Sequence, residues 1–113
     1  MLTRASGAAV LSALLCLACS PPPDPITLSE NTVVVLNTTS RDWRDVRITV
    51  NDHFTGGTPR LAAGGRLTAP LREMQTAFGQ HYDVTRQLVY KIEVMATDSR
   101  GDAVNLRWGR DKR

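Results

Sequence analysis

One short stretch, residues 46 to 50, limits the possible folds of this chain most strongly. Apolar Val46, Ile48 and Val50 alternate there with polar Arg47 and Thr49. Alternation with a period of two puts the apolar side chains on one face of an extended strand and the polar ones on the other. The stretch is therefore predicted to be a β-strand with one buried face.

Other apolar segments predict further short strands on both sides of this one. The run from Thr32 to Leu36 is apolar without alternation, as expected of a strand that is covered on both faces. Additional strands are expected at Ile26 to Leu28, Arg66 to Leu71, Gln87 to Thr97 and Ala103 to Trp108. In the segment 87–97, alternation places Leu88, Tyr90, Ile92, Val94 and Ala96 on one face.

Glycines and prolines predict where these strands are interrupted. Gly56, Gly57 and Pro59 are expected to end the strand that continues to Phe54. The segment 72–78 is left open, because Leu71, Met74 and Phe78 have helical spacing, while a bulged strand is the alternative. Five to seven short strands about ten residues apart, without strand–helix–strand alternation, predict an all-β fold, an immunoglobulin-like antiparallel β-sandwich over residues 26–109. Residues 110–113 form a charged tail.

The first 18 residues have the pattern of a secretory signal peptide. A positive start that ends at Arg4 precedes an uncharged, mostly apolar run from Ala5 to Ala18. This run is too short to cross a bilayer, which needs about 20 residues. The sequence from Leu15 to Cys19 resembles a lipobox, although Cys16 stands where an aliphatic residue is usual.

The lipobox resemblance implies that Cys19 becomes the first mature residue and carries lipid. Residues 19–25 are then the lipidated cysteine and a proline-rich spacer, since four prolines in six residues favour an extended chain. Ser20 after the cysteine resembles the outer-membrane default of Gram-negative lipoproteins. The expected localisation is the cell envelope, with the protein lipid-anchored to the outer membrane and facing the periplasm.

A further resemblance concerns the pattern of the whole mature chain. The run Trp43 to Asn51, the later pair Phe78-Gly79 and the final hairpin Leu88 to Trp108 are similar to small envelope domains of bacterial lipoproteins. Those domains resemble immunoglobulin or fibronectin-type-III folds. The resemblance implies a sandwich and carries no catalytic residues with it.

Charge and motifs exclude several function classes. The 14 basic and 11 acidic residues give a net charge of +3 that is scattered along the chain, so nucleic acid is not expected as a partner. Motifs for a nucleophile, a phosphate-binding loop or a dinucleotide are absent from the sequence. The two histidines, His53 and His81, match no metal-ligand spacing. We therefore predict no enzyme activity, no catalytic residues, no metal and no cofactor.

The two tryptophans are the candidate binding residues. Trp43 and Trp108 belong to the residue type most enriched at interface hot spots, and the alternative is that both fill a core poor in aromatics. The chain is thus expected to be a lipid-anchored envelope module that binds another envelope protein. Two alternatives stay open: a structural or assembly factor in an envelope complex, and a small metal-dependent enzyme that uses His53 and His81.

Overall fold

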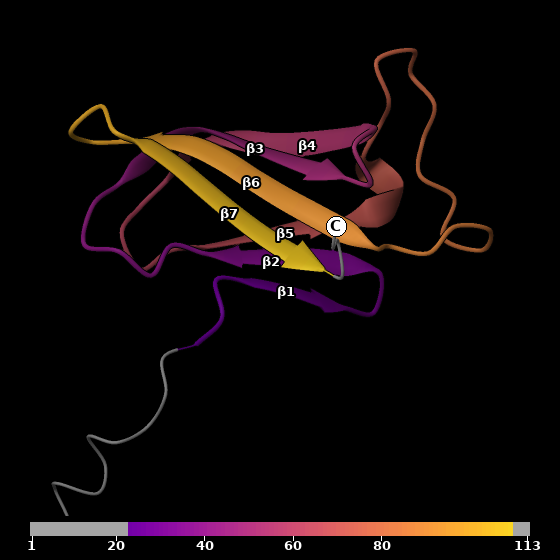
Figure 1. The fold of residues 1–113 in the computed structure, drawn as a ribbon, viewed down its shortest axis with the longest axis horizontal. Coiled ribbons are helices and arrows are strands. Elements are labelled where there is room, and N and C mark those ends of the chain that lie inside the picture. Colours follow the sequence, from indigo (N-terminus) through magenta and orange to yellow (C-terminus); the bar gives the residue numbers. More distant parts are fainter. Residues whose placement is uncertain (1–22, 110–113) are drawn as a thin grey trace, which may run out of the picture.

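The computed structural model describes residues 23–109, which form two antiparallel β-sheets packed face to face (Figure 1). Their strands are β1 (Ile26–Ser29), β2 (Thr32–Leu36), β3 (Trp43–Val50), β4 (Phe54–Leu61), β5 (Arg66–Pro70), β6 (Lys91–Asp98) and β7 (Ala103–Gly109), with one 3-10 turn, η1 (Leu71–Glu73). The all-β sandwich predicted from the sequence is confirmed.

The order of the strands is compatible with an immunoglobulin-like fold. One sheet has the order β1-β2-β5 and the other has the order β4-β3-β6-β7. An immunoglobulin constant-type domain pairs strands 1, 2, 5 and 4 in one sheet and strands 3, 6 and 7 in the other. Here the fourth strand pairs with β3 instead of β5, which gives a three-stranded sheet and a four-stranded sheet.

The core lies between the sheets and is aliphatic at its centre. Val46, Ile48 and Val50 of β3 are buried, as the alternation predicted, and they share the core with Ile92 and Val94 of β6. The opposite sheet contributes Val33 and Val35 of β2, whereas Val34 and Leu36 are half-buried. Strands β2 and β3 thus face each other across the core and belong to different sheets.

The prediction that Gly56, Gly57 and Pro59 end a strand is wrong. β4 continues through all three residues to Leu61. β4 is an edge strand of its sheet. Proline is tolerated in an edge strand, because such a strand has a neighbour on one side only and needs fewer N–H donors than a central strand. On its other side, in the pairing with β6, β3 has a bulge between Arg44 and Arg47, where Asp45 has a positive φ of 52°.

The prediction that a strand begins at Gln87 is also wrong in its first residues. β6 begins at Lys91, and Leu88 and Tyr90 are 87% and 51% exposed. The cause is the side chain of Asn51, whose Oδ1 accepts the N–H of Tyr90 (2.9 Å) and whose Nδ2 donates to the carbonyl of Leu88 (2.9 Å). These bonds hold the backbone in an irregular path before the sheet pairing starts.

The segment after β5 resolves the open choice between a helix and a bulged strand. A single 3-10 turn at η1 is followed by an extended chain, so neither alternative holds over its full length. Leu71 and Met74 are buried, whereas Phe78, which was grouped with them by helical spacing, is 93% exposed.

The two ends of the sandwich differ in what they carry. At one end lie the β2–β3 corner, the β4–β5 turn and the β6–β7 hairpin, which we call the corner end (Figure 1). The described chain starts at this end, where the carbonyl of Pro25 accepts the N–H of Leu36 (2.8 Å). The opposite end carries the β3–β4 turn and the long β5–β6 connection (Figure 1).

Several sequence predictions fall outside the described residues. The signal peptide 1–18, the lipid site Cys19 and the tail 110–113 all lie there. Between residues 23 and 109, the structure has no helix that is long and apolar enough to cross a membrane.

Candidate functional site

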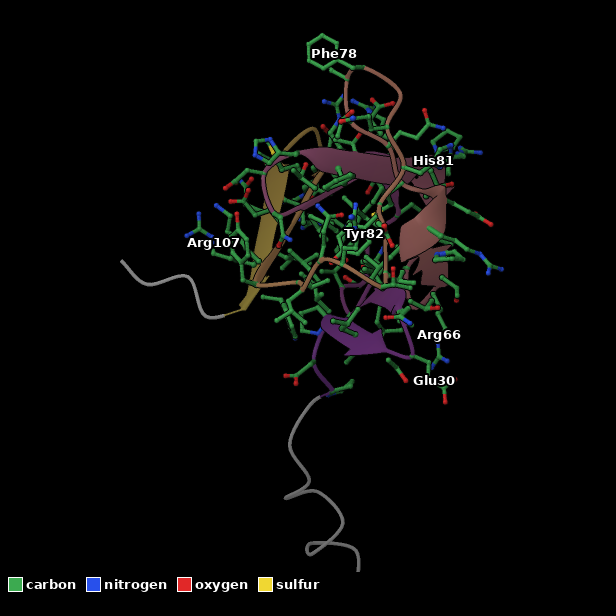
Figure 2. The ribbon with its side chains drawn as sticks, turned by 90° about the vertical axis from the view of Figure 1, so that its right-hand side faces the viewer. Glu30, Arg66, Phe78, His81, Tyr82 and Arg107 are labelled. Atoms are coloured by element: carbon green, nitrogen blue, oxygen red, sulfur yellow. The ribbon has the colours of Figure 1, made fainter. Side chains whose placement is uncertain are left out.

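We call the end of the sandwich opposite the chain start the crown. It carries the β3–β4 turn, residues 51–53, and the β5–β6 connection, residues 71–90. Connections as long as the β5–β6 segment are uncommon in compact domains and are frequently functional. In Figure 2, which looks onto this end, Tyr82 lies near the middle and Phe78 projects beyond the rest of the molecule.

The connection is fixed to the core by buried side chains. Leu71, Met74 and Tyr82 are buried, and the Tyr82 ring meets the Phe54 ring edge to face at a centroid distance of 5.0 Å. The Tyr82 hydroxyl donates to the carbonyl of Gln87 (3.0 Å). Burial raises the pKa of Tyr82, so its hydroxyl keeps its proton at neutral pH and stays a donor.

Residues 74–82 form a small hairpin, which we call the finger. Its arms are joined by the bonds from Tyr82 N–H to the Met74 carbonyl (3.1 Å) and from Thr76 N–H to the Gln80 carbonyl (2.9 Å). The three-residue tip closes with Gly79 N–H on the Thr76 carbonyl (3.0 Å). Gly79 has a φ of 85°, the left-handed conformation that ends such a tip. The apex residue of this closed loop is Phe78.

The finger is also attached to the edge of the four-stranded sheet. Gln75 pairs with Thr55, the second residue of β4, through bonds in both directions of 2.9 and 3.3 Å. Because backbone hydrogen bonds hold both its arms and its base, the finger presents Phe78 in a defined position rather than on a loose loop.

A groove separates the finger from the β3–β4 turn. Its volume is about 470 Å³, and it is lined by Asp52, His53, Phe54, Thr76, Ala77, Phe78, Gln80 and Gln87. A second hollow of about 380 Å³ lies beside it and shares Phe54, Gln80 and Gln87 with it. The exposed ring of Phe78 thus borders an open depression with both apolar and polar lining residues.

The charges of the crown are largely balanced by one another. Lys91 Nζ lies 2.6 Å from Asp52 Oδ1. The hydroxyl and the N–H of Thr85 both donate to the Asp83 carboxylate, and these bonds hold the pKa of Asp83 below its ordinary value. Arg86, which lines the second hollow with Asp83, also favours its charged form. A surface of this kind suits a protein partner better than a polyanion.

The two histidines lie in the crown but line different hollows. His53 belongs to the groove and His81 to the second hollow, where its Nδ1 lies 3.0 Å from the Arg72 carbonyl oxygen. Within residues 23–109, no three His, Cys, Asp or Glu side chains come together as a metal site would need. The structure therefore does not place the two histidines in one site.

The predicted binding residues are not brought together with the crown groove. Trp43 is 2% exposed and lies at the corner end, where β3 begins, so for this residue the core alternative is confirmed. Trp108 is half-buried on β7 and packs against the core. Cys19 lies outside the described residues.

Sequence reasoning missed Phe78 as a surface residue. The available signal was the glycine that follows it, because a polar residue, two tip residues and a glycine are typical of a three-residue hairpin loop. Helical spacing with Leu71 and Met74 concealed this pattern. The chain matches no protein-family model, no curated protein and no solved structure.

Proposed function

We propose that this chain is an exported module of a bacterial cell envelope, anchored in the outer membrane through lipid on Cys19, that binds another envelope protein in the periplasm through its crown. The observation that carries the proposal is the near-complete exposure of Phe78 at the apex of a hydrogen-bonded finger. A binding role without catalysis also fits the lack of a nucleophile motif in the sequence.

An exposed aromatic ring on a fixed support is a favourable anchor for a protein partner. Full burial of a phenylalanine side chain is worth about 1.5–3 kcal/mol. Little conformational entropy is lost when the ring docks, because the finger already holds it in place. The groove beside the ring combines apolar side chains with amide and carboxylate groups, as protein interfaces combine an apolar centre with a polar rim.

The position of the chain start supports the same role. Pro25 lies at the corner end, and the crown lies at the other end of the sandwich (Figure 1). A tether through residues 19–25 would therefore leave the crown directed away from the anchored membrane. The extended spacer, about 3.1 Å per residue, gives the domain additional distance from the lipid surface.

Site-specific photocrosslinking in intact cells tests the interaction. A photoreactive phenylalanine analogue at position 78 is expected to give one defined adduct with an envelope protein. The matched control carries the analogue at Met95, which is exposed on the outer face of β6, and should not give that adduct. Phe78→Ala should weaken co-purification of the same protein roughly 10- to 100-fold, the equivalent of the burial energy above.

Two results would contradict the proposal. Equal adducts from positions 78 and 95 would show that the crown has no preferred partner. An acyl label retained in Cys19→Ser would exclude the proposed anchor and leave the crown result to be judged by itself.

A further inference from the structure

Two arginines on the outer face of the four-stranded sheet lie directly opposite each other. Arg44 of β3 is the cross-strand partner of Arg60 of β4, and both are exposed. Like charges in directly opposed positions destabilise a sheet. Within residues 23–109, neither side chain has a hydrogen bond or an ion pair. Within the described residues, no direct ion pair therefore offsets the repulsion.

The pair borders a small hollow whose lining includes a buried tryptophan. The hollow has a volume of about 140 Å³ and is lined by Asp42, Trp43, Arg44, Arg60 and Ser99, and we call it the arginine hollow. Trp43 is almost fully buried, and its indole N–H has no acceptor among the described residues. Buried donors without an acceptor are rare in folded proteins, so this N–H is a sensitive reporter of changes beside the hollow.

We propose that the arginine hollow binds a phosphate-type oxyanion. Guanidinium groups match the geometry of phosphate oxygens and donate to them in pairs. The Ser99 hydroxyl adds a further donor at the rim. A volume of about 140 Å³ has room for a phosphate group.

One acidic side chain also lines the arginine hollow. Asp42 Oδ1 accepts the N–H of Ala63 (2.9 Å), so this carboxylate is held toward the β4–β5 turn. Arg44 and Arg60 outnumber it, and Arg47 stands on the same outer face beyond the bulge of β3. The excess of positive charge thus favours an anion while Asp42 limits its affinity.

The arginine hollow lies at the corner end, where the described chain starts. Asn37 connects these parts, because its Nδ2 donates to the Leu61 carbonyl (3.1 Å), next to Arg60, and its neighbour Leu36 bonds to Pro25. If the proposed tether is correct, this end faces the anchored membrane. Phosphate chemistry then has two sources, a phospholipid headgroup or free phosphate, which an experiment can separate.

The test follows the indole N–H signals of Trp43 and Trp108 in NMR spectra of the full chain in a nonionic detergent. The variant Trp108→Phe lacks one of the two signals and so assigns both. One titration adds sodium phosphate against sodium chloride at equal ionic strength. A second replaces phosphatidylcholine in the micelles by phosphatidylglycerol. We expect a saturable shift of the Trp43 signal, with the Trp108 signal as the internal reference.

Matched arginine variants decide whether the shift reports the arginine hollow. Arg44→Gln and Arg60→Gln should each raise the ligand concentration at half-saturation at least tenfold. Arg66 is an exposed arginine on β5 in the other sheet, and Arg66→Gln should leave this concentration unchanged. Removal of one like charge should also raise the melting temperature of the ligand-free protein, which shows that the variant is folded.

The outcomes separate the sources and also test the site itself. Saturation by both ligands supports a general phosphate site, and saturation by phosphatidylglycerol alone assigns the arginine hollow to a lipid headgroup. A shift that survives in Arg44→Gln, or no saturable shift with either ligand, overturns the proposal. Neither result bears on the crown, so the two proposals fail independently.

Discussion

Asn37 is a fully buried amide that joins three segments at the corner end. Its Nδ2 donates to the carbonyls of Arg41 (2.8 Å), Leu61 (3.1 Å) and Ala62 (3.2 Å). Its Oδ1 accepts from the N–H and the hydroxyl of Thr39. These bonds hold the polar corner to its own backbone and connect it to the end of β4 and the β4–β5 turn.

Replacement of Asn37 should therefore be costly. Asn37→Ala leaves buried carbonyls without a donor, and we expect a loss of about 2–4 kcal/mol in the free energy of unfolding. Urea denaturation measures this value. Asn105→Ala, an exposed asparagine on β7, should change it by less than about 0.5 kcal/mol. Equal effects in both variants would contradict the assigned role of Asn37.

Asp98 predicts how stability depends on pH. Burial alone would raise the pKa of this carboxyl, but the N–H groups of Asp102 and Arg100 donate to it. The Arg41 guanidinium, 3.4 Å away, adds to their effect, so the pKa lies below its ordinary value of 3.8. The stabilisation is then fully present above pH 3.8 and is lost as the pH falls through the lower, folded-state pKa.

Asp98→Asn should flatten the acid limb of the stability curve. Chemical denaturation between pH 5 and 2 should show a smaller decrease in the unfolding free energy than in the wild type. An unchanged slope in Asp98→Asn would show that this carboxylate has the same pKa in the folded and unfolded chain.

At the scale of elements, the two glycines of β4 have different roles. A Cβ on Gly57 would lie 2.0 Å from the Val46 carbonyl oxygen, whereas a Cβ on Gly56 would meet the Met74 side chain at 3.4 Å. The first position is closed by backbone at the β3 bulge. The second is filled by Met74, which occupies the space that a side chain at position 56 would take.

Alanine variants should separate the two positions. Gly57→Ala must displace the backbone of an edge strand, and we expect a loss of at least about 2 kcal/mol in the free energy of unfolding. Gly56→Ala, its direct neighbour with the same change in chain entropy, should stay within about 1 kcal/mol of the wild type. Thermal melts of both proteins provide the comparison, and the reverse order of stability would refute it.

The elements that the sequence predicted correctly are those whose faces are set by burial. Val46, Ile48, Val50, Ile92 and Val94 alternate because each second position must enter the core, and the structure places all of them there. Alternation fails for Leu88 and Tyr90, because a distant side chain, Asn51, sets the backbone path at that point. No local pattern reveals a contact between residues almost forty positions apart.

The remaining errors have a similar origin in tertiary context. Gly56, Gly57 and Pro59 are poor residues for a central strand, and the sequence alone does not show that β4 lies at an edge. Phe78 has the spacing of a buried residue, and its exposure depends on the hairpin bonds of the finger. The sequence left residues 72–78 open between a helix and a bulged strand, and neither alternative predicted an exposed ring at Phe78.

At the scale of the whole molecule, the proposed anchor at Cys19 together with the fold predicts an orientation on the membrane. The chain start and the arginine hollow lie at the corner end, and Phe78 lies at the other. In lipid-anchored protein reconstituted in vesicles, a fluorophore on Ala63→Cys should be quenched by a headgroup quencher at least twice as strongly as one on Phe78→Cys. Ala63 is exposed in the β4–β5 turn at the corner end.

Two controls complete the orientation experiment. Free fluorophore calibrates the quencher, and protein with Cys19→Ser shows the quenching without an anchor. Equal quenching of the two positions in the anchored protein would contradict a preferred orientation.

The attachment of the finger to β4 has a consequence for self-association. An edge strand exposes backbone groups with which the edge of a second molecule can pair, and this is a common route to aggregation. Pro59 removes one donor from this edge, and Gln75 covers the position of Thr55 near its beginning. A shortened finger would uncover that edge, so variation in its length is constrained by colloidal solubility, independently of the proposed partner.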